Sequence, residues 1–530
     1  MRGRDVLLEV LRTEGVRHIF GNPGTTELPF IDALADNDSD GPADLHYVLA
    51  LQEATAVGMA DGYAQATRRP AFLNLHTSAG LGNAIGNLTN AQANRTPLVV
   101  TAGQQDRRHL VADPLLSGDL VGLARGVSKW THEVRNANEL GTILRRAFHD
   151  AASAPSGPVF VSIPMDVLDD DAADGTVPAV PAVSSIRRRA VADGVDELAA
   201  MLGGSIAIVA GDEVAASGAV DALADVARRA GAAVFGAPLR GAVVYPRDDP
   251  QWRGDLPPLA AAINAALAPF DRVLVIGERL LVYPYSDGPL MPASVDVLHL
   301  TADAGQLGRV QSTVLGLLGD VRATLEAVAD RLPTVDAAAA PTASSDFDER
   351  ARSRYGDVPM HPMAATHALL RALPADAPVV DEAITTGAYV RGFHGDGQYF
   401  FNRGGGLGWG MPAALGISLA LDRGPVVCVV GDGSAMYSPQ ALWTAAHEQL
   451  PVLFAVVNNR QYLILKRNLP PGKAYPGLDL DAPPVDFVAL AESMGVGATL
   501  VEKADDVADA ARAAWDSGEP RLLELPISAP

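Results

Sequence analysis

The 530-residue sequence has only one cysteine, Cys428. A single thiol excludes an intrachain disulfide and a zinc site built from cysteines. Cys428 lies in the apolar run 425–430, where we expect a buried and unreactive core residue. The sequence also lacks any run of about 18 uncharged apolar residues, so we expect no membrane-spanning helix and no membrane partner.

Basic charge is scarce as well. There are 41 Lys and Arg residues against 63 Asp and Glu, which gives a net charge of −22. So acidic a surface repels nucleic acid, and we expect none as a partner. The densest basic run, Arg187–Arg189, is interpreted as part of a solvated linker. Residues 1–15 mix charged and apolar side chains at helical spacing, unlike a signal peptide, so we predict a cytoplasmic protein.

The sequence does contain a regular alternation of strand-like and helix-like segments. Short apolar runs follow helical patterns along nearly the whole chain, which predicts an α/β fold of mostly parallel sheets with flanking helices. At about 150 residues per domain, the length predicts three or four domains. The expected strands include 48–51, 71–75, 97–102, 158–163, 206–211 and 272–277, and the expected helices include 54–67 and 140–154.

Two stretches have the composition of linkers. Residues 169–185 are acidic and then rich in Pro, Ala and Val, and residues 333–345 are rich in Ala, Thr and Ser. They divide the chain into three predicted domains, 1–170, 186–332 and 350–530.

The clearest chemical motif lies in the third domain. An apolar strand at 426–430 runs into Gly-Asp-Gly-Ser at 431–434, and the next expected strand, 451–457, is followed by Asn458 and Asn459. One βαβ crossover therefore places Asp432 and Asn459 at the carboxyl ends of parallel strands, where such sheets bind ligands. Their oxygens suit Mg²⁺, and the glycines let backbone amides approach a phosphate. An ordinary turn is the alternative for the Gly-Asp-Gly segment alone.

This pair of motifs resembles the signature of thiamine-diphosphate enzymes. Four N-terminal segments extend the resemblance in the same order, namely 21–30, 49–54, 74–80 and 101–105. Together they resemble the benzoylformate decarboxylase branch of the 2-oxo acid decarboxylase and acetohydroxyacid synthase superfamily. The resemblance implies a pyrimidine-binding domain at 1–170, a central domain at 186–332 and a diphosphate- and Mg-binding domain at 350–530.

The resemblance also implies cofactors and partners. Thiamine diphosphate and Mg²⁺ would be bound, and the substrate would be a small 2-oxo acid. A homodimer or homotetramer is expected, with the first domain of one subunit facing the third domain of its neighbour across each active site.

Three residues match catalytic positions of the family. Glu53 matches the carboxylate that bonds the aminopyrimidine ring, although alone it would be interpreted as an exposed glutamate at a helix start. His76 matches a histidine that relays protons, although a lone histidine is more often a core or surface residue. Thr25 matches a serine whose hydroxyl binds the substrate carboxylate.

The expected cofactor contacts lie in the third domain. Leu407 resembles the bulky residue that holds the cofactor bent, and the Gly405 carbonyl matches the acceptor for its amino group. Asp432, Asn459 and the backbone carbonyl of Gln461 match the metal ligands. The remaining expected contacts to the cofactor are Thr385, Thr386, Gly431, Gly433, Ser434 and Tyr462.

The substrate side departs from the pattern of the aryl-specific enzymes. Their central-domain Tyr-His pair is Tyr283-Pro284 here, so a second proton donor must come from elsewhere, with Tyr285 and His109 as candidates. Ile464 replaces a small pocket residue. The expected apolar pocket comprises Leu115, Leu116, Phe401, Ile464 and Leu465.

These residues predict non-oxidative decarboxylation of a 2-oxo acid, benzoylformate-like or with another apolar side chain, to an aldehyde and CO₂. One alternative is a carboligase that forms acyloins, similar to an acetohydroxyacid synthase. A weaker alternative is a catalytically degenerate interaction protein. A nicotinamide-binding Rossmann enzyme is disfavoured because no Gly-x-Gly-x-x-Gly follows a first strand.

Overall fold

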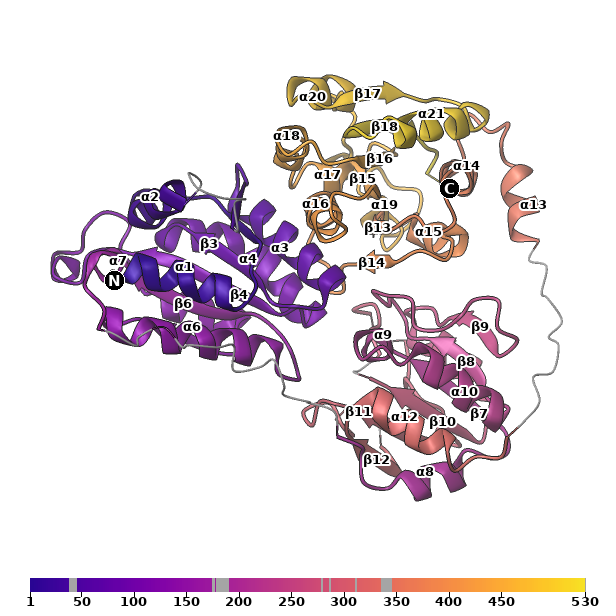
Figure 1. Cartoon of the computed structure of the whole chain (residues 1–530). Coiled ribbons are helices and arrows are strands. Elements are labelled where there is room, and N and C mark those ends of the chain that lie inside the picture. Colours follow the sequence, from indigo (N-terminus) through magenta and orange to yellow (C-terminus); the bar gives the residue numbers. More distant parts are fainter. Residues whose placement is uncertain are drawn as a thin grey trace. The chain divides into compact units, whose positions relative to one another are not determined.

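The structure is a computed structural model that describes residues 1–37, 45–173, 177, 190–277, 280–285, 287–309, 312–334 and 346–529. Most of the two predicted linkers, and all of Arg187–Arg189, fall outside these residues. The chain forms two compact units, one of Met1–Ser184 with Asp346–Pro530 and the other of Ser185–Ser345. The described residues contain three six-stranded sheets, all of whose strand pairs are parallel, as predicted (Figure 1).

The N-terminal sheet has the strand order β2-β1-β3-β4-β6-β5. Its strands are β1 (His18–Gly21), β2 (His46–Leu49), β3 (Ala71–Leu75), β4 (Leu98–Gln104), β5 (Thr131–Glu133) and β6 (Val159–Pro164). Its helices are α1 (Gly3–Thr13), α2 (Leu28–Asn37), α3 (Glu53–Thr67), α4 (Thr77–Asn94), α5 (Leu120–Ala124), α6 (Ala137–Ala152) and α7 (Met165–Asp169).

Both faces of this sheet are buried. Because successive strand residues point to opposite faces, Phe72 and Val99 join one apolar cluster with α1 and α6, whereas Leu73 and Val100 join another with α3 and α4. This explains why the strands are continuous apolar runs rather than alternating patterns.

The C-terminal sheet has the order β14-β13-β15-β16-β18-β17. Its strands are β13 (Val379–Glu382), β14 (Tyr399–Phe401), β15 (Val426–Gly431), β16 (Val452–Asn458), β17 (Gly497–Leu500) and β18 (Arg521–Pro526). Its helices are α13 (Phe347–Arg352), α14 (Pro362–Ala372), α15 (Gly387–Phe393), α16 (Gly410–Ala420), α17 (Asp432–Ala435), α18 (Gln440–His447), α19 (Leu463–Lys466), α20 (Phe487–Ser493) and α21 (Ala504–Asp516).

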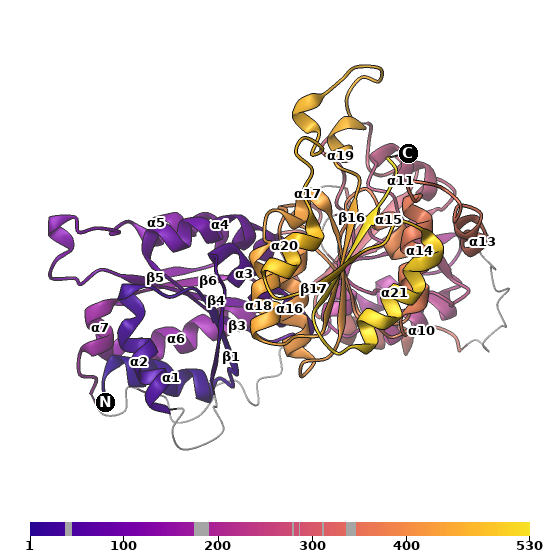
Figure 2. The same ribbon diagram turned by 90° about the horizontal axis from the view of Figure 1, so that it is seen from above.

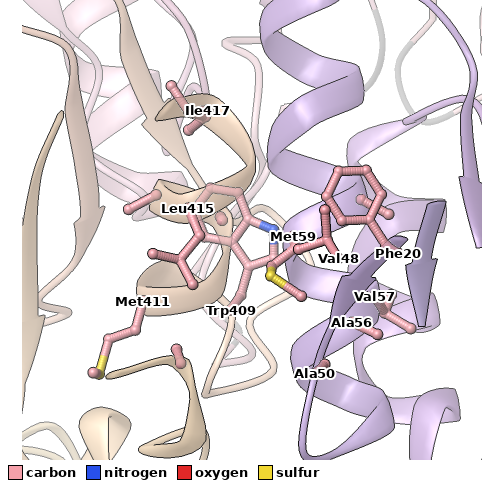
Figure 3. Packing of buried hydrophobic residues seen from close by; sticks show 14 of the residues in the cluster. Phe20, Val48, Ala50, Ala56, Val57, Met59, Trp409, Met411, Leu415 and Ile417 are labelled. Atoms are coloured by element: carbon pink, nitrogen blue, oxygen red, sulfur yellow. The ribbon is translucent and has the colours of Figure 1, made fainter. Parts of the chain in front are cut away.

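Helices α3 and α16 join these two domains. A Cβ on Gly416 would lie 1.9 Å from the Met59 carbonyl oxygen, so the two backbones approach as closely as glycine permits. Both views place the helices side by side, and Figure 3 shows Trp409 and Met59 packed between them. One apolar cluster extends across both domains, which explains why they form a single unit.

A buried carboxylate reinforces this junction. Asp61 of α3 accepts a 2.8 Å hydrogen bond from the Trp409 indole Nε1. Its oxygens also accept hydrogen bonds from three neighbours in the N-terminal domain, Gln65, Asn94 and Thr96. Burial raises the pKa of Asp61, so these four donors are what make its position tolerable in the core.

The second unit contains the central sheet, with the order β12-β11-β10-β7-β8-β9. Its strands are β7 (Ile206–Ala210), β8 (Ala233–Gly236), β9 (Trp252–Asp255), β10 (Arg272–Ile276), β11 (Asp296–Thr301) and β12 (Leu315–Leu318). Its helices are α8 (Val195–Met201), α9 (Asp212–Ala216), α10 (Val220–Ala230), α11 (Ala260–Leu267) and α12 (Val321–Ala329). Apolar clusters cover both faces of this sheet.

The strand and helix predictions agree with the structure to within a few residues. For example, 71–75 and 206–211 correspond to β3 and β7. Cys428 is fully buried, as expected. None of the described helices is long and apolar enough to cross a lipid bilayer.

Candidate active site

A cleft lies at the carboxyl edge of the C-terminal sheet. It encloses about 440 Å³, including space open to solvent. Eleven of the residues singled out in the sequence line it: Thr385, Thr386, Leu407, Gly431, Asp432, Gly433, Ser434, Asn459, Gln461, Tyr462 and Ile464. The fold therefore gathers the expected diphosphate, metal and cofactor-bending residues around one space.

Asp432 and Asn459 follow neighbouring strands. Gly431 of β15 pairs with Val457 of β16, so the residues after these strands share the sheet edge. The Asp432 Oδ1 accepts a 2.9 Å hydrogen bond from the Gly433 N–H, but its buried Oδ2 has no hydrogen-bond partner. Burial also raises the pKa of Asp432. A hard divalent cation would satisfy this uncompensated carboxylate oxygen, and Asn459 in the same cleft adds a neutral oxygen, so these residues fit Mg²⁺.

Glu382 directly precedes Ala383, which lines the cleft. Its carboxylate accepts backbone N–H groups of Trp409 at 3.1 Å and Gly410 at 2.8 Å, at the start of α16. Burial raises the pKa of Glu382 to about 7. Since Leu407 lies just before these amides, Glu382 fixes where the segment that carries Leu407 enters the helix. The sequence analysis missed Glu382 because it looks like the last residue of a buried strand.

Glu53 lies at the corresponding edge of the N-terminal sheet. It begins α3 and is largely buried, which excludes the exposed helix-start interpretation. Side-chain amides hold both of its oxygens, that of Asn22 at 3.2 Å and that of Asn83 at 3.0 Å. These two neutral donors fix the orientation of the carboxylate.

His76 lies after β3 on the same edge and is held by Glu27. Its Nδ1 is 2.9 Å from the Glu27 Oε2 and 3.0 Å from the Thr26 hydroxyl. The hydrogen bond to Glu27 raises the pKa of His76. The carboxylate also accepts the N–H groups of Gly24 and Gly103. Because Nδ1 is committed to these partners, Nε2 is the nitrogen that remains for proton transfer.

Glu27 was not singled out in the sequence, although it belongs to the segment 21–30 that carried the resemblance. The available signal was its place in the sequence, three residues after Gly24, from which its carboxylate can accept the Gly24 N–H. The backbone is strained next to His76. Thr77, the residue after it, has a φ of +46°, which is unfavourable for a β-branched residue. Such strain clusters at functional sites.

Other predicted residues do not line the cleft. Glu53 and His76 belong to the N-terminal domain, and all lining residues of the cleft lie between 383 and 464. Leu115 is 86% exposed, Phe401 is buried in β14, and Thr25 and Leu465 are exposed. Gly405 precedes Leu407 in the same loop. The remaining candidates outside the cleft are Leu116, His109 and Tyr285, of which all three are exposed.

Comparison with known proteins identifies the domains. Residues 1–131, 195–328 and 384–525 match the N-terminal TPP binding, central and C-terminal TPP binding domains of thiamine pyrophosphate enzymes. Benzoylformate decarboxylase from Pseudomonas aeruginosa is 34% identical, over 98% of this chain and 97% of that protein. Acetolactate synthase isozyme 3 large subunit from Escherichia coli is 28% identical, over 93% of this chain and 89% of that protein.

Solved structures agree. The Rhodococcus jostii thiamine-diphosphate-dependent 4-hydroxybenzoylformate decarboxylase has a TM-score of 0.90 and 31% identity, over 100% of this chain and 99% of that one. Benzoylformate decarboxylase from Polynucleobacter necessarius has a TM-score of 0.89 and 30% identity over the same shares. The chain therefore belongs to the thiamine-diphosphate-dependent enzyme family, in the superfamily of 2-oxo acid decarboxylases and acetolactate synthases.

Proposed function

We propose that the protein is a thiamine-diphosphate- and Mg²⁺-dependent decarboxylase that converts a 2-oxo acid with an apolar side chain, such as benzoylformate, to an aldehyde and CO₂. The observation that carries this proposal is the Glu27–His76 pair. A histidine whose pKa is raised by a buried carboxylate is a proton donor, and a decarboxylase must deliver a proton to release its aldehyde. The likeness to two benzoylformate decarboxylases supports it.

In this proposal, the C-terminal cleft binds the cofactor. Asp432, Asn459 and the Gln461 carbonyl would hold Mg²⁺, while Thr385, Thr386 and residues 431–434 would hold the diphosphate. Tyr462 and Leu407 would complete the contacts. When bound, thiamine diphosphate would supply a thiazolium ring that accepts the electron pair left as CO₂ departs.

The residues of the N-terminal domain would manage protons and the substrate. Glu53, oriented by Asn22 and Asn83, would bind a ring nitrogen of the aminopyrimidine and hold a proton there. His76 would give a proton to the product through Nε2, and Thr25 would bind the substrate carboxylate. Ile464 in the cleft would limit the side chain, with Leu115, Leu116, Phe401 and Leu465 adding apolar surface.

We further propose that two copies complete each site. Glu53 and His76 are not among the lining residues of the cleft, all of which lie between 383 and 464. An assembly in which the first domain (1–170) of one subunit meets the third domain (350–530) of another would join them, with 186–332 as the central domain. The exposed apolar side chains of Val111 and Leu115 in the first domain are suited to such a contact.

Carboligation is the second candidate. Pro284 stands where the aryl-specific relatives have a histidine, and its neighbour Tyr285 is 61% exposed within its own unit. With fewer acids available, protonation would slow, and a second carbonyl compound would compete to form an acyloin.

Product analysis tests the proposal. Benzoylformate, pyruvate and a branched 2-oxo acid should be incubated with protein, thiamine diphosphate and Mg²⁺, with and without an acceptor aldehyde. We expect benzaldehyde and CO₂ from benzoylformate. Acyloin as the main product without added acceptor would favour the carboligase, and failure to bind the cofactor would favour a degenerate interaction protein.

A further inference from the structure

The loop 404–408 links β14 to α16 and begins with three consecutive glycines. It carries the Gly405 carbonyl and Leu407, to which the proposed function assigns the cofactor's amino group and its bent shape. Gly405 has a φ of +75°, and glycine backbones adopt many alternative conformations at little cost. The loop has few side chains to hold it, so its shape must be imposed by other parts of the molecule.

Asn90 of α4 provides such a constraint. Its side chain is fully buried, and its Oδ1 accepts the Gly406 N–H at 3.0 Å while its Nδ2 donates to the Gly406 carbonyl at 3.0 Å. One side-chain amide thus pairs with both polar groups of one glycine. The same Nδ2 donates to the Asn87 Oδ1 at 2.8 Å, which fixes which end of the amide is the donor.

The pairing matters because of peptide geometry. The Gly406 N–H and the Gly405 carbonyl are the two ends of one planar trans peptide unit, so they point in opposite directions. Binding the N–H therefore sets the direction of the Gly405 carbonyl. The Gly406 carbonyl belongs to the next peptide unit, which leads into Leu407, and it also accepts the Asn402 amide at 2.8 Å.

Asn87 continues the network. Its Nδ2 donates to the carbonyl of Ala54 at 2.7 Å and to that of Gly408 at 3.4 Å. Ala54 follows Glu53 in the first turn of α3. Two asparagines on α4 thus connect the backbone beside Glu53 with both ends of the Gly406–Gly408 segment.

We propose that Asn90 is a positioning residue for the cofactor, which it would influence only by orienting the Gly405 carbonyl and the entry into Leu407. This role rests on the proposed function, because that function makes the Gly405 carbonyl a cofactor contact. Asn90 itself touches backbone and Asn87, and no step of proton transfer is assigned to it. The orientation of bound groups affects the reaction rate more strongly than it affects binding. Loss of the Asn90 side chain should therefore lower the reactivity of the cofactor more than its affinity.

A purely structural role is the competing explanation, and Asn94 is the matched control. It lies one turn later on α4, its Oδ1 accepts the Arg403 N–H at 2.9 Å, and its Nδ2 donates to Asp61 at 3.2 Å. Asn94 therefore ties the same helix to the residue that precedes the glycines through its acceptor bond, while its donor bond goes to Asp61 of α3.

The first experiment needs no cofactor. Amide hydrogen exchange at single-residue resolution should show faster exchange of the Gly406 N–H in Asn90→Ala, by on the order of tenfold or more, because its buried acceptor is lost. Asn94→Ala should leave Gly406 protected. Equal exchange at Gly406 in wild type and Asn90→Ala would overturn the proposal.

The second experiment uses the holoenzyme. At saturating thiamine diphosphate and Mg²⁺, the rate of C2–H exchange for deuterium, followed by NMR after acid quench, should fall on the order of tenfold to a hundredfold in Asn90→Ala. The dissociation constant of the cofactor should change much less, and Asn94→Ala should keep both values near wild type. An equal fall in both variants would show a merely structural role.

A conservative variant keeps the test decisive if Asn90→Ala does not fold. Asn90→Asp retains an acceptor for the Gly406 N–H and, when its buried carboxyl is protonated, a donor for the carbonyl. Asn90→Asp should recover part of the C2–H exchange rate that Asn90→Ala loses, and a larger part at lower pH, where the carboxyl is protonated. If the wild type binds no thiamine diphosphate, the proposed function fails and this role fails with it. If the wild type exchanges the C2 proton and the Asn90 variants do so at the same rate, this role alone is overturned.

Discussion

The N-terminal and C-terminal sheets arrange their strands alike. In each, the first strand lies between the second and third, the fourth follows, and the sixth lies inside the fifth. The central sheet has the different order of a Rossmann fold, with its first and fourth strands adjacent at the centre. The outer domains therefore invite comparison position by position.

Equivalent strand ends carry different chemistry. The third strand leads to His76 in the N-terminal domain and to Asp432 in the C-terminal domain. The second strand leads to Glu53 and α3 in one, and to the loop 404–408 and α16 in the other. In the proposed function, one edge holds groups that would exchange protons, and the other holds groups that would bind a cation and a phosphate. The shared topology sets where functional residues stand, and the side chains set what each edge does.

The largest effect is expected at the binding edge. Asp432→Ala should weaken Mg²⁺-dependent retention of thiamine diphosphate by more than about a hundredfold, because it removes the one carboxylate proposed to bind the metal. Calorimetric titration with cofactor, with and without Mg²⁺, measures this. Asp422→Ala, which removes the same charge from a side chain that is 93% exposed, is the control. Normal retention in Asp432→Ala would place the metal elsewhere.

At the proton edge the effect should fall on reactivity. Glu53→Gln keeps the shape and should leave cofactor affinity nearly unchanged, but it removes the group proposed to hold the ring proton. C2–H exchange should slow by on the order of a hundredfold or more. A variant that exchanges at the wild-type rate would remove Glu53 from the mechanism, and one that loses the cofactor would erase the contrast between the two edges.

Glu27→Gln should change the pH dependence. In the wild type, the hydrogen bond that His76 donates to Glu27 raises the pKa of His76, so the ion pair is complete below the ordinary histidine pKa and is lost as pH rises through the raised value. Without the carboxylate, His76 loses its proton at lower pH, and the alkaline limb of kcat/KM moves toward acid. At about pH 8 we expect roughly a tenfold loss, with less at pH 6.

Thr26→Val supplies the control for that profile, because it removes the uncharged hydroxyl that lies near the His76 Nδ1 and leaves the Glu27 carboxylate in place. Its alkaline limb should stay near the wild-type position. Identical profiles for wild type and Glu27→Gln would show that His76 does not supply the titrating proton.

The smallest effect concerns the junction between the two domains. Trp409→Phe replaces the buried indole with a smaller aromatic ring and removes the N–H that donates to Asp61, at a cost of about 1 to 3 kcal/mol in the free energy of unfolding. Urea unfolding measures it. Trp443→Phe, whose ring stacks on His447 at the edge of the same domain, should cost less. Equal costs would mean that the Asp61 bond adds nothing to the junction.

Sequence patterns were most informative where one strand end determines the position of a residue. Asp432 and Asn459 could be placed at one edge because a single crossover separates two apolar strands, and the cleft contains both. Glu53 could be placed at a strand-to-helix boundary for the same reason. Such inferences need only the hydrophobic pattern and the rule for parallel sheets.

The supporting residues needed tertiary structure. Asn90 lies more than three hundred positions from Gly406, and nothing in the local pattern of α4 distinguishes it from Asn94. Glu27 and Glu382 accept backbone N–H groups from distant segments, which no spacing rule reveals. The apolar pocket residues Leu115 and Leu465 stay predictions, because both are exposed in the structure and neither lines the cleft.

The close approach of α3 and α16 also bears on how such a protein can be recombined. Because the α3 and α16 backbones are in contact at Gly416, a substitution that enlarges either surface would need a compensating change in the other domain. The central unit, 185–345, is by contrast one uninterrupted segment with cores of its own. Chimeras that exchange this segment between relatives should preserve folding far more often than chimeras that exchange residues 1–184 alone. The chain thus forms two compact units, although it contains three sheets.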